Sequence, residues 1–216
     1  SDKESLTGPL LVGVKVGPTE GDHSQNVVQV TNMSSMLLPS TSDYDSLSQK
    51  GSLQQEANAQ KLSYVLGRVG YSDSEISSLL SSAYAFEIKL AHAIDRGNTA
   101  STVDLAAQME ASANRYSWND LASLQGAFPL TDLLAQNGYR VAEVSVENPE
   151  YIKELGALCT AENLPLFKAW YTVRTALSAT ELLDQDTYQF AQQVDTECQL
   201  KQAQASSSDG DERDSD

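Results

Sequence analysis

The chain has 216 residues, of which 40% are hydrophobic, so it is long enough and apolar enough to bury a substantial core. Its 30 acidic residues outnumber its 14 basic ones, and the formal net charge of −16 repels nucleic-acid phosphates and anionic lipid surfaces. No apolar run approaches the roughly 18–20 residues that span a bilayer. We therefore expect a folded domain that binds no nucleic acid and does not cross a membrane. The first residue is Ser1 rather than methionine, which indicates a processed or excised chain.

Residues 1–50 are expected to form an extended arm with loops. Short β-branched runs at 10–16 and 27–31 are bounded by Gly, Pro, Asp and Asn, which predicts two extended segments around a polar loop at 17–26. These segments can pair as an antiparallel ribbon. Because such an arm needs something to pack on, the stretch 10–38 is our candidate for a partner-facing surface.

The apolar spacing then becomes helical, which predicts a helical domain over residues 51–200. Gly70 is placed to end the first helix, since glycine adopts the left-handed conformation of a helix C-terminus. Ser72 and Glu75 form a capping box that opens a long helix reaching Arg96. The apolar stripe of this long helix comprises Ile76, Leu79, Leu80, Ala83, Phe86, Leu90 and Ile94.

Shorter elements are predicted in the middle of the chain. The helical period resumes at 103–111, and Ser117 with Asp120 caps a short helix. Pro129 starts another helix that runs into a breaker at 137–138. The segment that follows has Val144 and Val146 on one side, which favours an extended link or a strand over 140–147.

Residues 148–178 are predicted to form a helical hairpin. Asn148 can cap the first helix, and Pro149 suits its first position, where no backbone donor is needed. Pro165 disfavours helix in the residue before it and starts the second helix. The seam of the hairpin comprises Tyr151, Ile152, Leu155 and Leu158, followed by Phe167, Trp170, Tyr171, Arg174 and Leu177.

Asp186 opens a last helix, and residues 201–216 are expected to be a disordered acidic tail. The fold class that these elements indicate is mainly α, a multi-helix domain of antiparallel helices with a short extended or β N-terminal arm.

The spacing of the histidine and cysteine residues does not predict a catalytic or metal site. Catalytic zinc needs about three protein ligands, but neither His23 nor His92 has a second histidine four residues away. A mixed site with Cys159 and Cys198 would require four distant elements to converge. We therefore expect no catalytic, metal-binding or cofactor-binding residue in this chain.

Other candidate residues have ordinary structural interpretations. Asp22-His23-Ser24 contains the residue types of a hydrolase triad, but neighbours in sequence cannot adopt its geometry. Asp43 and Asp45 lack the spacing of a calcium loop, so a solvated surface is the favoured interpretation. The two cysteines are expected to be buried or idle thiols, with a single bridge as the alternative in an oxidising compartment. The aromatic residues at helical spacing, which are Trp118, Trp170 and Tyr171, are expected in the core.

Four stretches carry a family resemblance through their order and spacing. They are Asp22-His23-Ser24-Gln25-Asn26-Val27-Val28 with Leu38-Pro39 and Tyr44; Leu66-Gly67 to Gly70-Tyr71 with Phe86-Glu87 and Leu90-Ala91; Asn114-Arg115-Tyr116 with Leu121 and Phe128-Pro129; and Val146 with Asn148-Pro149-Glu150-Tyr151 and Leu166-Phe167-Lys168-Ala169-Trp170-Tyr171. Together they resemble the N-terminal helical region of the neprilysin-like (M13) zinc metallopeptidases, which include bacterial oligopeptidases of the endopeptidase O type. The chain departs from that pattern in the loop before Leu38, which has Met33-Ser34-Ser35-Met36 and only one following tyrosine, Tyr44.

This resemblance implies a non-catalytic helical lobe that limits substrate access to a closed cavity. The partner of this lobe would be the catalytic lobe of the same parent protein. The substrates of that protein would be short oligopeptides, and it would be located outside the cell or at the cell surface. Zinc is expected in that other lobe, since no His-Glu-x-x-His occurs in these 216 residues. The chain alone is therefore expected to be inactive, and its status as an enzyme is uncertain. The alternatives are a non-catalytic helical surface binding module and a scaffolding bundle whose similarity is accidental.

Overall fold

The computed structural model describes residues 11–19, 22–103 and 114–211, which are mainly helical with a small four-stranded sheet. The predicted mainly α fold class is thus confirmed. The chain divides into two compact units. The described parts of unit 1 are 36–88 and 165–211, and those of unit 2 are 11–19, 22–35, 89–103 and 114–164.

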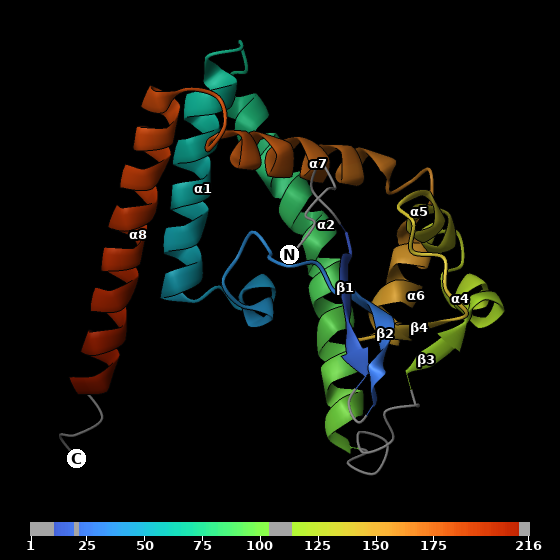
Figure 1. Ribbon diagram of the computed structural model, residues 1–216. Helices are drawn as coiled ribbons and strands as arrows, with labels where there is room; N and C mark the ends of the chain where they lie inside the picture. The colour runs from blue at the N-terminus through green and yellow to red at the C-terminus, as the bar shows by residue number, and fades with distance from the viewer. Residues whose placement is uncertain (1–10, 20–21, 104–113, 212–216) are drawn as a thin grey trace. The chain divides into compact units, whose positions relative to one another are not determined.

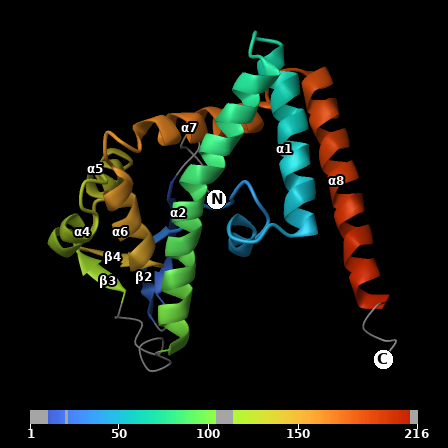
Figure 2. The same cartoon turned by 180° about the vertical axis from the view of Figure 1, so that it is seen from behind.

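Unit 1 is built from helices α1 (Gln49–Gly67), α7 (Leu164–Ala179) and α8 (Gln185–Asp211), the first half of α2 (Asp73–Val103), and the short 3-10 helix η1 (Thr41–Tyr44). Helices α1 and α8 lie side by side (Figures 1 and 2). An ion pair of 2.7 Å joins Lys61 Nζ to Asp195 Oδ1, and the rings of Tyr64 and Phe190 stack with their centroids 4.2 Å apart.

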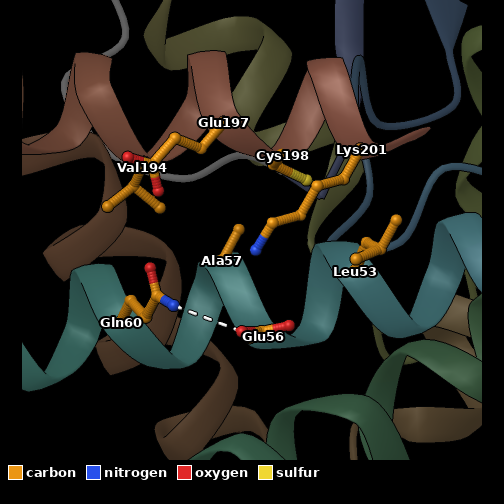
Figure 3. Close-up of a pocket in the computed structure, with 8 residues that line it drawn as sticks. All are labelled: Leu53, Glu56, Ala57, Gln60, Val194, Glu197, Cys198 and Lys201. Carbon is orange, nitrogen blue, oxygen red and sulfur yellow. Dashed lines mark hydrogen bonds between the residues drawn. The ribbon is translucent and has the colours of Figure 1, made fainter. Parts of the chain in front are cut away.

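The apolar contact between α1 and α8 is tightly packed. Ala57, Val194 and Cys198 form a buried cluster with Leu53 and Phe190 against it, and Ala57 and Cys198 lie between the two helices in Figure 3. The cavity at this contact has a volume of only about 10 Å³, which is the space of a single water molecule at most. This contact is therefore a packing interface rather than a ligand pocket.

The helix boundaries in unit 1 follow the predicted signals. Gly70 follows α1 with φ +102°, the left-handed conformation that glycine adopts without a steric penalty. At the start of α2, the Glu75 backbone N–H donates to Ser72 Oγ (3.2 Å) and the Ser72 N–H donates to Glu75 Oε2 (2.8 Å). The predicted capping box is therefore confirmed.

Unit 2 contains a mixed sheet of β1 (Gly13–Thr19), β2 (Asp22–Thr31), β3 (Arg115–Ser117) and β4 (Glu143–Val146) in the order β1-β2-β4-β3. Strands β1 and β2 are antiparallel, as the sequence predicts. The polar loop expected over 17–26 is wrong, however, because the strands extend through Thr19 and from Asp22. The ribbon is not a separate arm, since β2 pairs in parallel with β4 and β4 pairs with β3.

The helices of unit 2 are the second half of α2, α4 (Trp118–Leu124), α5 (Leu130–Gln136) and α6 (Pro149–Leu158). The predicted caps are present: Ser117 Oγ accepts from the Asp120 N–H (3.2 Å), and Asn148 Oδ1 accepts from the Tyr151 N–H (3.2 Å). Val144 and Val146 on β4 are fully buried, which confirms the predicted inward side of this strand.

Two sequence predictions differ from the structure, and parts of them lie outside the described residues. Helix α8 continues to Asp211, so residues 201–211 are not disordered. Gln202 donates to the backbone carbonyl of Lys50 (3.1 Å) and Ala205 is buried, and these contacts extend the helix into the acidic region. The compact units also cut across the predicted boundaries at residues 50 and 200. Residues 1–10, 20–21, 104–113 and 212–216 lie outside the described residues, and they include residues 104–111 of the helix expected at 103–111.

Candidate functional site

A buried carboxylate lies at the centre of unit 1. Glu87 on α2 has no exposed surface, although it is a charged residue type that proteins rarely bury unless it is paired. Its position in the sequence explains its burial, because it follows Ala83 by four residues and precedes Leu90 by three on the apolar stripe of the helix. An acid within an apolar stripe was the available signal, and the sequence prediction missed it.

The oxygens of Glu87 accept hydrogen bonds from three residues of unit 1, two in the loop 36–44 and one on α7. Oε2 accepts from the backbone N–H of Leu37 (2.9 Å) and from the hydroxyl of Tyr44, and Oε1 accepts from the indole Nε1–H of Trp170 on α7 (2.8 Å). The Tyr44 oxygen in turn accepts from the backbone N–H of Leu38 (3.3 Å). The carboxylate therefore fastens the loop 36–44 to α2 and α7.

The environment of this cluster sets the charge states of its members. Burial raises the pKa of the Glu87 carboxyl above its ordinary value near 4.5, while its hydrogen-bond donors and the positive charge of Arg174 act in the opposite direction. Burial also raises the pKa of Tyr44, with a further contribution from the negative charge of Glu87, and burial raises the pKa of Tyr84. Both tyrosines are thus protonated at neutral pH, and the hydroxyl of Tyr44 donates to Glu87. The side chain of Glu87 has no exposed surface, and all of its hydrogen-bond partners belong to the chain itself. This cluster therefore has a structural role.

A pocket of about 320 Å³ lies beside this cluster within unit 1. Its walls come from the loop at 36–39 and from α1, α7 and α8. The lining residues are Met36, Leu37, Leu38, Pro39, Gln54, Asn58, Lys61, Arg174, Leu177 and Gln202. The pocket is therefore amphipathic, with an apolar side from the loop and a polar side from the helices.

Two cations and a fixed amide form the polar side of the pocket. Lys61 is 12% exposed at its side chain and pairs with Asp195, and the Arg174 guanidinium lies 5.9 Å from the centroid of the Trp170 ring. The Asn58 amide donates to the carbonyl of Leu37 (3.0 Å) and to the hydroxyl of Tyr84 (3.1 Å), and its oxygen accepts from Gln54 Nε2 (3.1 Å). The sequence prediction singled out none of these residues as a site.

The residues weighed as metal ligands are not brought together where the structure describes them. His92 is half-buried on α2, the side chain of His23 lies outside the described residues, and Cys159 and Cys198 are free thiols. Burial raises the pKa of both thiols. Among the described residues, no group of three or more His, Cys, Asp or Glu is placed to hold a metal ion.

Several other predictions about single residues can be compared with the structure. The solvated surface expected for Asp43 is wrong, since its carboxylate is buried and accepts from the backbone N–H groups of Ser40 (3.2 Å) and Ser48 (3.0 Å). Trp170 is buried as expected, but Tyr171 is 45% exposed because it lies one position further around α7.

The candidate partner-facing stretch 10–38 is mostly packed inside the chain's own units. Six of its apolar side chains are buried, namely Val12, Val28, Val30, Met33, Leu37 and Leu38. Leu11, Val14, Val27 and Met36 are half-buried, and Val16 has 53% of its surface exposed. Among the described side chains of this stretch, Val16 is the one large hydrophobic residue that is exposed.

The helices and the sheet form a mainly helical domain. Its described residues include no group placed to bind a metal ion. None of the helices within the described ranges is long and apolar enough to cross a membrane. The model for the N-terminal region of peptidase family M13 matches residues 3–213, so the chain belongs to this family. No curated protein sequence matches the chain.

Solved structures share this fold. PepO from Lactobacillus rhamnosus HN001 has a TM-score of 0.68 and 23% identity over 87% of this chain and 29% of its own. The zinc metalloprotease Zmp1 of Mycobacterium tuberculosis, in complex with an inhibitor, has a TM-score of 0.65 and 18% identity over 86% of this chain and 27% of its own. The open state of Zmp1 has a TM-score of 0.66 and 19% identity over 85% of this chain and 28% of its own. The chain thus spans less than a third of the length of these relatives.

Proposed function

We propose that this chain is the substrate-access-limiting helical part of a zinc metalloendopeptidase that acts on short peptides. The observation that carries the proposal is the family match over residues 3–213 in a chain that corresponds to only 29% of PepO. In this proposal, zinc and the residues that activate water belong to a catalytic domain, which is the partner of this chain. Catalysis by zinc needs about three protein ligands and an open position for water.

The contribution of this chain would be exclusion and positioning. A rigid structure is needed to exclude water and bulky substrates from a reaction chamber. Holding a peptide in a reactive orientation also lowers the activation barrier of its cleavage. Capped helices and the buried anchor at Glu87, which ties the loop 36–44 to two helices, support such a rigid role.

The test compares the chain with the polypeptide encoded by its complete reading frame. We expect the complete polypeptide to bind zinc and to cleave a quenched fluorescent peptide of about ten residues, but not an unfolded protein substrate, in a chelator-sensitive way. The chain of 216 residues alone should not cleave the peptide, with or without added zinc. Hydrolysis by the chain alone would contradict the proposal. A complete reading frame without His-Glu-x-x-His would favour the alternative, a non-catalytic helical surface binding module.

The proposed location is outside the cell or at its surface, and it rests on the resemblance to neprilysin-like enzymes. Fractionation of source cells with an antibody against this chain tests it. Recovery of the antigen in the cytosolic fraction alone would contradict this location.

A further inference from the structure

The pocket beside the Glu87 cluster has the size of a small-molecule site. Its volume of about 320 Å³ lies at the lower end of the range of about 300–1,000 Å³ that is typical of ligand pockets. By contrast, the cavity between α1 and α8 has about 10 Å³ and has no room for an organic ligand. Every residue that lines the larger pocket belongs to unit 1, so its shape is set within one compact unit.

The charge of the pocket lining is opposite to the charge of the whole chain. The chain carries a formal net charge of −16, yet the pocket lining includes two cations, Lys61 and Arg174, and no carboxylate. Asp195 forms the ion pair with Lys61 but does not itself line the pocket. Lys61 and Arg174 are therefore the charged groups that line this concave, partly apolar pocket.

The Lys61 ammonium has capacity for an additional anionic partner. An ammonium group has three donor hydrogens, and the hydrogen bond to Asp195 Oδ1 at 2.7 Å uses one of them. The side chain of Lys61 is only 12% exposed. A carboxylate that enters the pocket would gain a charge-assisted hydrogen bond in a partly dehydrated setting, where such bonds are stronger than neutral ones.

The remaining walls are fixed before any ligand arrives. Asn58 is 3% exposed, and its amide is held by Leu37, Tyr84 and Gln54. The loop that supplies the apolar side is fastened by the bond from the Leu37 N–H to Glu87. Because binding to a preorganised pocket loses less conformational entropy, this rigidity favours specific binding.

We propose that this pocket binds a small organic carboxylate with a short apolar body. The carboxylate contacts Lys61 and Arg174, and the apolar body lies against the loop at 36–39 and Leu177. The volume corresponds to roughly ten water molecules at about 30 Å³ each, which limits the ligand to a compact molecule. This site does not depend on peptide cleavage, so the proposed function and this proposal can fail separately.

The test uses the full chain with octanoate as the probe, and with 1-octanol and octylammonium as the neutral and cationic analogues. Calorimetry and NMR titration measure affinity and location. We expect saturable binding of octanoate, with shifts at Asn58 and Leu177, and binding at least about tenfold weaker for both analogues, since they lack the charge-assisted bond.

Variants of Lys61 separate the charge from the shape of the pocket. Lys61→Met should weaken octanoate binding by roughly 10- to 100-fold, because it removes a hydrogen bond to a charged group, and Lys61→Arg should retain most of the binding. The matched control is Lys153→Met, which removes a lysine that is also ion-paired (3.3 Å to Glu150 Oε1) but belongs to unit 2. Circular dichroism confirms that each variant is folded.

Three results would overturn the proposal. The first is the absence of saturable octanoate binding to the folded chain. The second is equal binding of octanoate and 1-octanol, which would show an apolar surface without a charge-selective site. The third is an unchanged affinity in folded Lys61→Met.

Discussion

Glu87 shows how a single buried acid determines the arrangement of a loop and two helices. A buried carboxylate is costly unless its oxygens are hydrogen-bonded, and here both oxygens have donors from other segments. Leu37 and Trp170 are separated from Glu87 by 50 and 83 residues along the chain. The acid therefore makes the position of the loop 36–44 depend on contacts that are distant in sequence.

We predict that Glu87→Gln lowers the free energy of unfolding by about 1–3 kcal/mol at neutral pH. Glutamine has nearly the same shape, but one of its two ends is a donor. Whichever way the amide is turned, that end faces the N–H of Leu37 or of Trp170, and one buried donor loses its acceptor. Urea denaturation measures the change. Glu56→Gln at an exposed position on α1 is the control, with an expected change within about 0.5 kcal/mol.

The effect of this substitution should also depend on pH. Because burial raises the pKa of Glu87 in the folded state above the ordinary value near 4.5, this group stabilises the fold most when it is protonated, and that contribution is lost as pH rises through the raised pKa. The difference in unfolding free energy between the natural chain and Glu87→Gln should therefore grow as the pH is lowered from neutral toward the ordinary pKa near 4.5. A difference that shrinks on acidification would show that the hydrogen bonds outweigh burial.

At the scale of elements, α6 and the end of α4 approach each other closely enough to require glycine. A Cβ atom at Gly156 on α6 would clash with the backbone carbonyl oxygen of Gln125, the residue that caps α4. A backbone atom cannot rotate away as a side chain can, so one of the helices would have to shift. This contact joins the C-terminal end of α4 to the last turn of α6 within unit 2.

We predict that Gly156→Ala destabilises the chain by about 1–3 kcal/mol, the usual cost of overpacking. The control is Gly67→Ala at the last residue of α1, where an added Cβ meets nothing within 4 Å. That substitution should stabilise the chain by about 0.4–1 kcal/mol, because alanine restricts the unfolded chain. Chemical denaturation of both variants tests whether their free energies of unfolding change in opposite directions. Equal changes in the two variants would contradict a close approach at Gly156.

The elements that sequence reasoning predicted are those whose ends carry local signals. The capping pair Ser72–Glu75 and the glycine at Gly70 act within a few residues, so their effect can be read from the sequence alone. The parallel pairing of β2 with β4 could not be predicted in this way, because Val28 and Val144 are joined only by the tertiary fold. The pocket was missed for the same reason, since its lining comes from four separate segments.

At the scale of the whole molecule, each compact unit is assembled from stretches that are far apart in sequence. Unit 1 combines residues 36–88 with 165–211, and α2 contributes to both units. The change to helical apolar spacing predicted the boundary at residue 50, and the acidic composition of the tail predicted the boundary at residue 200. Both signals report local preferences only. A boundary defined by contacts between distant stretches does not leave a signal of that kind.

The net charge of the whole molecule predicts how its thermal stability depends on salt. With a formal net charge of −16, like charges repel each other more in the folded chain than in the expanded unfolded chain. Opposing attractions are weak, since ion pairs such as Arg68–Asp184 and Lys153–Glu150 are largely exposed and such pairs contribute about 0–1 kcal/mol.

Raising NaCl from about 10 mM to about 150 mM shortens the Debye length from about 30 Å to about 8 Å and screens the longer-range repulsion first. We expect the Tm at neutral pH to rise by about 2–4 °C, the shift that about 1 kcal/mol produces in a protein of this size. The same titration near pH 5, where some carboxylates are protonated, should give a smaller rise. A Tm that falls with added salt would mean that attractive ion pairs, rather than the acidic surplus, dominate the electrostatics of the fold.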